Sequence, residues 1–161
     1  MLPDLRNILY ATDMSDNAAP AFQYVMLLAK KIGADVHILH VVERLSNDAR
    51  ITLESYVLDE DERKRVLNER VSNAKKLLNQ CLEDVTSRLE GEDRKLRERI
   101  VSIEVCESYP VEEILKRGQA CDLIVMGTHE KGFMSPFIGS VAKSVLHSSS
   151  VPVLVVPLPP R

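Results

Sequence analysis

Leu123-Ile124-Val125-Met126-Gly127 is a continuous apolar run that ends in a glycine. Two further runs have the same character, Val36-His37-Ile38-Leu39-His40-Val41-Val42 and Val153-Leu154-Val155-Val156. A strand that is covered on both faces loses the alternation of polar and apolar residues that a half-exposed strand shows. The three runs therefore predict buried strands of a parallel sheet.

Two weaker strand patterns belong to the same sheet. Asn7-Ile8-Leu9-Tyr10-Ala11 lies near the start of the chain. Ile100-Val101-Ser102-Ile103-Glu104-Val105 alternates in polarity, which favours a more exposed place toward the edge of the sheet.

Four helical patterns separate these strands, each with apolar residues at helical spacing and several with recognisable end signals. The helices are expected from Ser15 or Asp16 to Ile32, from residues 59–62 to about Leu89, from Pro110 through Leu115, and from Gly139-Ser140 through Leu146. Strands and helices thus alternate along the chain. This order predicts right-handed crossovers and an α/β, doubly wound parallel sheet.

The whole chain, residues 1–161, is expected to form a single domain. The connection over residues 43–59 is long for a link between a strand and a helix, and its apolar content is consistent with either a short helix or a mobile lid. The tail over residues 157–161 begins with a proline, so it cannot continue the last strand and is expected to fray.

Composition excludes several classes of protein. Hydrophobic residues make up 45% of the chain and charged residues 28%, as in ordinary globular proteins. A net charge of −3 without clustered Lys and Arg argues against a nucleic-acid partner, and no apolar run is long enough to span a membrane. We expect a cytoplasmic protein whose cysteines, Cys81, Cys106 and Cys121, are reduced thiols.

Two glycines mark the candidate ligand site. Ligands bind beyond the carboxyl ends of the strands in open parallel sheets, and Gly127 stands at such an end. A glycine there lets a phosphate approach the backbone, and Gly139-Ser140 at a helix start offers free N–H groups. The alternative is that Gly127 and Gly139 form only a tight turn and a helix entry, with Asp13 capping the next helix.

The histidines carry no obvious catalytic or metal-binding role. His129 lacks an evident partner for general acid catalysis, so a polar contact to the ligand is the better interpretation. His37 and His40 are expected to be packed or to lie at an edge. No catalytic group and no metal ligand is predicted.

Three separated motifs resemble the universal stress protein family. They are Asn7-Ile8-Leu9-Tyr10-Ala11-Thr12-Asp13-Met14-Ser15, Cys121-Asp122-Leu123-Ile124-Val125-Met126-Gly127-Thr128-His129, and the ending from Gly139-Ser140-Val141-Ala142 to Val151-Pro152-Val153-Leu154-Val155-Val156. The resemblance implies a Rossmann-like, adenine-nucleotide hydrolase-like fold with five parallel strands in the order 3-2-1-4-5. It also implies homodimers paired through the last strand, residues 152–156.

The resemblance further implies a site for ATP, with Mg²⁺ on the phosphates as a possible companion. Each implied contact corresponds to a position that matches the family pattern. Ala11, Thr12 and Asp13 would meet the adenine and ribose, Val41 would line the base pocket, Met126, Gly127, Thr128 and His129 would lie beneath the ribose and phosphates, and Gly139, Ser140 and Val141 would bind the phosphates.

The chain departs from the ATP-binding signature of that family in one place. Glu130-Lys131-Gly132 occupies the span where the second signature glycine belongs, and the loop is one residue shorter. A carboxylate about 4 Å from a phosphate charge costs roughly 1 kcal/mol in water and about 4 kcal/mol in a partly dry cleft. Two hypotheses therefore stand: a regulatory module that binds ATP with slow or no hydrolysis, and a family member that binds no nucleotide and acts through protein–protein contacts.

Overall fold

The computed structural model describes residues 3–15, 18–128 and 138–157. Within these residues five strands form one parallel sheet in the order β3-β2-β1-β4-β5. The strands are β1 (Asn7–Ala11), β2 (Asp35–Glu43), β3 (Ile100–Ser108), β4 (Leu123–Gly127) and β5 (Val153–Val156). The predicted α/β fold and strand order are confirmed, with β1 at the centre and with β3 and β5 at the two edges.

Both faces of the central strands are buried. In β1, Ile8 and Tyr10 belong to one hydrophobic core, whereas Leu9 and Ala11 belong to a second core on the opposite face. All four side chains are at most 6% exposed. This double burial explains why the strand sequences contain so few polar residues.

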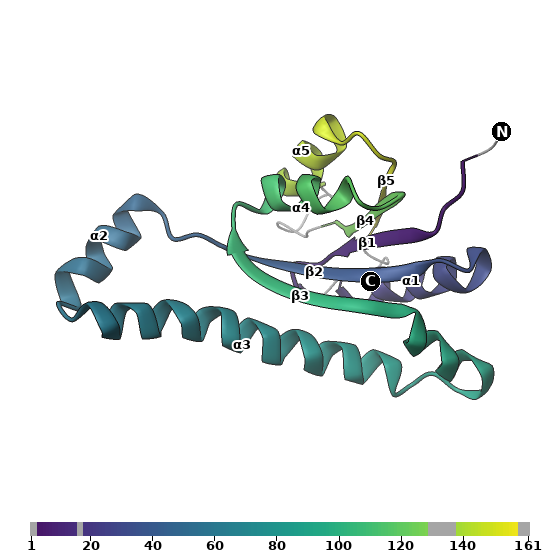
Figure 1. Cartoon of the computed structure of the whole chain (residues 1–161), viewed down its shortest axis with the longest axis horizontal. Coiled ribbons are helices and arrows are strands. Elements are labelled where there is room, and N and C mark those ends of the chain that lie inside the picture. Colours follow the sequence, from purple (N-terminus) through teal and green to yellow (C-terminus); the bar gives the residue numbers. More distant parts are fainter. Residues whose placement is uncertain (1–2, 16–17, 129–137, 158–161) are drawn as a thin grey trace.

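Two pairs of helices form the outer layers (Figure 1). Helices α1 (Ala18–Ile32) and α3 (Glu60–Thr86) cover one face of the sheet, and α4 (Pro110–Gly118) and α5 (Ser140–Ser148) cover the other. Gly33 follows α1 with φ of 72°, a left-handed conformation that suits glycine at the end of a helix. The N-terminus of α1 was expected at Ser15 or Asp16. The helix is described from Ala18, and residue 16 lies outside the described residues.

The long connection after β2 contains a helix, which confirms one of the two expectations for residues 43–59. Helix α2 (Asn47–Tyr56) is capped by Ser46, whose hydroxyl accepts a hydrogen bond from the N–H of Ala49. Asp59 caps α3 in the same way, with its carboxylate accepting from the N–H groups of Asp61 and Glu62. Helix α3 ends at Thr86, three residues before the predicted end.

A short 3₁₀ segment, η1 (Gly91–Arg99), was not predicted. Its sequence is almost entirely charged, so it carries no periodic apolar stripe. Tertiary contacts help to hold it in place. Leu96 packs against the core, and the Arg99 guanidinium donates a hydrogen bond of 2.9 Å to the carbonyl of Gly33.

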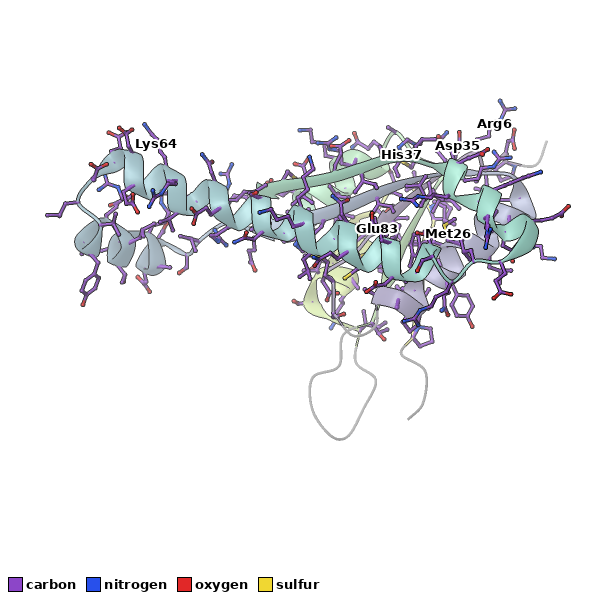
Figure 2. The ribbon with its side chains drawn as sticks, turned by 90° about the horizontal axis from the view of Figure 1, so that it is seen from below. Arg6, Met26, Asp35, His37, Lys64 and Glu83 are labelled. Atoms are coloured by element: carbon purple, nitrogen blue, oxygen red, sulfur yellow. The ribbon has the colours of Figure 1, made fainter. Side chains whose placement is uncertain are left out.

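Helix α2 and the first part of α3 project beyond the carboxyl ends of the strands (Figure 1). We call residues 47–66 the helical arm. Figure 2 shows Lys64 on this projection, whereas Glu83 lies where α3 crosses the sheet. No residue of α2 is buried, and the buried residues of α3 are Leu78, Leu82 and Thr86, all in its second half. None of the helices in the described part of the chain combines the length and apolarity needed to cross a membrane.

Candidate functional site

A cavity of about 440 Å³ opens at the carboxyl ends of β1, β2 and β4. Strands β2 and β3 lie on one side of β1, whereas the later strands β4 and β5 lie on its other side. The cavity therefore lies at the point where the winding reverses, which is the usual ligand site of such sheets. Its volume falls in the range of small-molecule sites.

The structure brings most of the predicted site residues to the wall of this cavity. The residues that line it are Ala11, Thr12, Asp13, Val41, Met126, Gly127, Gly139, Ser140 and Val141. Thr128 is not among the lining residues. Its side chain is 6% exposed, and its N–H donates a 2.9 Å hydrogen bond to the carbonyl of Val156, so its backbone extends the pairing of β4 with β5. His129 and Glu130 lie outside the described residues.

The loop after β1 is held in shape by its own side chains. The N–H of Met14 donates to the hydroxyl of Thr12 at 3.1 Å, and the N–H of Ser15 donates to the carboxylate of Asp13 at 2.9 Å. These bonds hold Met14 at φ of 58°, a left-handed conformation that is uncommon for a residue with a side chain. Asp13 thus helps to organise the loop in which it lies.

Strand β2 supports this loop from the side. The N–H of Thr12 donates to the carbonyl of Leu39 at 3.0 Å, and Nδ1 of His40 lies 2.8 Å from the carbonyl oxygen of Thr12. A carbonyl can only accept a hydrogen bond, so Nδ1 of His40 carries the proton. His37 is held by Ser102 and Asn7 at the other end of the strand. Both histidines are thus half-buried and held by hydrogen bonds, in line with the expected packed or edge role.

The cavity has an apolar slot between the sheet and α4. Leu39 and Val41 of β2 form the floor beside Ala11, and Pro110 and Ile114 of α4 lie on the cavity wall as well. Alternate residues of a strand point to the same face, so Glu43 shares the face of Leu39 and Val41. A flat aromatic ring fits a slot of this kind.

The opposite part of the cavity presents backbone groups. Gly127 ends β4, and Gly139 is the N-cap of α5, with φ of −60° and ψ of 160°. Among residues 3–15, 18–128 and 138–157, no side chain forms a capping hydrogen bond at this helix start. The first N–H groups of a helix have no partner within the helix, and the helix dipole adds positive potential there. These two features make the N-terminus of α5 suitable for binding an anion.

The charged side chains on the described wall are both acidic, namely Asp13 and Glu43. Within the described residues no Lys or Arg lines the cavity. On the described wall, the groups that can attract an anion are therefore backbone N–H groups.

Several wall residues were not predicted from the sequence. Tyr10, Glu43, Pro110, Ile114, Ile138 and Ala142 also line the cavity. The period of two along β2 could have found Glu43, because it follows Val41 at the spacing that returns to the same face. The α4 residues had no such signal, since their place depends on how α4 packs against the sheet.

Other reactive groups lie apart from this cavity. The three cysteines are free thiols, and burial raises the pKa of both Cys106 and Cys121, which disfavours the reactive thiolate. Among the described residues no group of three or more His, Cys, Asp or Glu side chains is arranged to hold a metal ion.

Known proteins resemble this chain over nearly its whole length. The model of the universal stress protein family matches residues 4–157. Universal stress protein MJ0577 from Methanocaldococcus jannaschii is 30% identical, and the match covers 94% of each chain. The solved structure of MJ0577 superposes with a TM-score of 0.65 at 27% identity, over 99% of this chain and 100% of that one.

Two further structures share the fold. UspA from Lactobacillus plantarum superposes with a TM-score of 0.69 at 20% identity, over 96% of this chain and 99% of that one. A universal stress protein solved in complex with cAMP has a TM-score of 0.51 at 18% identity, over 96% and 98%. Since both the family model and a 30% identical relative span almost the entire chain, this protein belongs to the universal stress protein family.

Proposed function

We propose that this protein is a homodimeric module that binds an adenine nucleotide, ATP, in a stress-response or regulatory role. One observation carries the proposal: an apolar slot and the N-terminus of α5, which no described side chain caps, share the wall of a single cavity. A nucleotide needs both, because its base is flat and largely apolar whereas its phosphates are anionic.

Each part of ATP has a matching part of the wall. The base would occupy the slot of Ala11 and Val41, the ribose would lie near Asp13 and Met126, and the phosphates would meet Gly127 and Gly139. Mg²⁺ bound to the phosphates would offset their charge, because the described wall has no Lys or Arg. That a member of the same family was solved with cAMP, an adenine nucleotide, supports the choice of base.

Hydrolysis of ATP is proposed to be slow or absent. None of the residues assigned to the site among the described ones is a lysine or an evident general base for activating water. The module would then act by being occupied or empty, rather than by turnover.

The decisive experiment places a charge at the start of α5. Both Asp and Asn are good N-cap residues and accept the backbone angles of Gly139, so Gly139→Asp and Gly139→Asn should both keep the helix. We expect Gly139→Asp to weaken ATP binding at least tenfold through repulsion of the phosphates, and Gly139→Asn to weaken it much less. Calorimetry on nucleotide-stripped protein measures both, and adenosine serves as the ligand without phosphates.

Equal affinity of the Asp and Asn variants for ATP would contradict binding of the phosphates at α5. If the stripped protein takes up no ATP at millimolar concentration, the proposal fails as a whole. The second candidate function then holds, in which the protein acts through protein–protein contacts without nucleotide. The missing second signature glycine, together with the carboxylate of Glu130, favours that candidate.

The homodimer is proposed to form through residues 152–156. Strand β5 lies at the edge of the sheet and contains only apolar residues, Val153, Leu154, Val155 and Val156. Antiparallel pairing with the same strand of a second copy would continue the sheet across this edge with two-fold symmetry.

A further inference from the structure

Three side chains of β2 follow one another along the floor of the cavity. Leu39 is only 2% exposed, Val41 is half-buried, and Glu43 is exposed at the carboxyl end of the strand. All three line the cavity. The apolar floor therefore ends in a carboxylate, two residues beyond the position assigned to the base.

The backbone of Glu43 is held firmly. It pairs with Ser108 of β3, and its carbonyl accepts a 2.9 Å hydrogen bond from the guanidinium of Arg70 on α3. The next residue continues the pairing, since the N–H of Arg44 donates to the carbonyl of Ser108 at 3.3 Å. The backbone that carries the Glu43 carboxylate is thus held in place at the rim of the cavity.

The arginines near Glu43, Arg44 and Arg70, interact with other side chains. Nη1 of Arg70 pairs with the carboxylate of Glu107 at 3.1 Å, and the guanidinium of Arg44 lies over the ring of Tyr109, 5.2 Å from its centroid. In the described part of the chain no residue forms an ion pair or a side-chain hydrogen bond with the Glu43 carboxylate. Its oxygens remain available to a ligand.

Resting on the proposed function, we propose that Glu43 is a specificity-determining residue that accepts a hydrogen bond from the 6-amino group of the adenine ring. An ionised carboxylate can only accept hydrogen bonds, so it favours a ring that carries a donor at the edge facing the cavity mouth. A purine with hydrogen at position 6 keeps the shape and stacking of adenine but offers no such donor.

A double-mutant cycle tests this assignment. The affinities of ATP and of purine riboside triphosphate, which lacks the 6-amino group, are measured by calorimetry for the unaltered protein and for Glu43→Ala. In the unaltered protein we expect ATP to bind about tenfold more tightly, because a hydrogen bond to a charged group is strong but this one is partly exposed. In Glu43→Ala we expect the two ligands to bind equally.

Glu112→Ala is the matched control. Glu112 is an exposed acidic residue in the first turn of α4, next to Pro110 on the rim, and it does not line the cavity. This variant should keep the tenfold preference for ATP, which separates a hydrogen bond from a general effect of negative charge.

The possible results separate the two proposals. If the unaltered protein binds neither ligand, the proposed function fails and the role of Glu43 falls with it. A second possible result is that the unaltered protein binds both ligands equally well, or that Glu43→Ala keeps the preference for ATP. In either case nucleotide binding stands, but Glu43 does not bind the 6-amino group.

Discussion

The hydroxyl of Tyr10 lies between the core and the cavity. The side chain is 1% exposed, its ring packs against Phe22 with the centroids 5.8 Å apart, and its hydroxyl donates a 2.8 Å hydrogen bond to the carbonyl of Ala18. Ala18 begins α1, so this bond joins the first turn of the helix to the central strand. Burial raises the pKa of Tyr10 to about 12.

This raised pKa makes the protein lose stability at alkaline pH. A tyrosine in the unfolded chain ionises near pH 10, whereas Tyr10 in the folded protein keeps its proton up to about pH 12. The contribution of Tyr10 is complete below about pH 10 and is lost as the pH rises to about 12, by up to about 2–3 kcal/mol. We expect Tyr10→Phe to flatten the fall of the unfolding free energy over this range.

Denaturant unfolding at a series of pH values measures that slope. The absorbance titration of the unaltered protein minus that of Tyr10→Phe isolates the ionisation of Tyr10 itself. The assignment is wrong if the two proteins lose stability in parallel between about pH 10 and 12.

At the scale of the elements, the helical arm and the second half of α3 differ in how they are supported. Helix α2 has no buried residue, and its apolar side chains include Ile51 at 61% exposure and Tyr56 at 85%. Leu78 and Leu82 of α3, in contrast, belong to the core. The hydrogen bonds of the arm therefore depend mainly on its caps and on pairs within the helix, such as Lys64 with Glu60.

We expect the arm to open locally without unfolding of the domain. Hydrogen exchange should be much faster for the amides of residues 47–66 than for those of residues 78–86, because local opening exposes almost no apolar surface in the arm. Asp59→Ala removes the acceptor for the N–H groups of Asp61 and Glu62, so exchange should accelerate further in the first turn of α3. Exchange measured by mass spectrometry with peptide resolution checks both statements. Equal protection of the two segments would show that something else holds the arm.

At the scale of the whole molecule, the two edges of the sheet are unlike each other. Strand β3 carries Glu104 and Glu107, which form ion pairs with Arg117 and Arg70. Charges of this kind discourage a second strand from pairing with an edge. Strand β5 has no charged residue, and Leu154 is 37% exposed on it. The difference indicates which edge is suited to a partner strand.

A lysine at each edge tests this prediction. We expect Leu154→Lys to convert the proposed dimer into monomers, because a charge would be buried without a partner in the pairing. Val101→Lys is the matched control on β3, where the replaced side chain is 50% exposed. Light scattering should give the mass of one chain, 18.1 kDa, only for Leu154→Lys. The β5 dimer is refuted if the unaltered protein already has this mass at micromolar concentration.

Sequence patterns predicted the elements that burial dictates. The runs in β2 and β4 are apolar because both faces of those strands contact a core, and that requirement is visible in the residues themselves. The same pattern in β5 correctly predicted a strand but not its burial, since only Val156 is buried and Leu154 is 37% exposed at the edge of the sheet. Segments without a burial requirement were predicted less well. The charged segment η1 was missed, and the end of α3 was placed at Leu89 instead of Thr86.

By itself the sequence determined that the chain forms a sheet whose strands alternate with helices. It also determined that one glycine ends a strand and another begins a helix. Each of these features is a local consequence of periodicity or backbone freedom. Tertiary structure alone decided that Glu43 of β2 and Ile114 of α4 line the same cavity as Gly127 and Gly139. These residues are far apart along the chain, and they come together only because parallel strands end at one edge of the sheet while α4 and α5 pack across it. Such proximity depends on packing between elements, which no local pattern encodes.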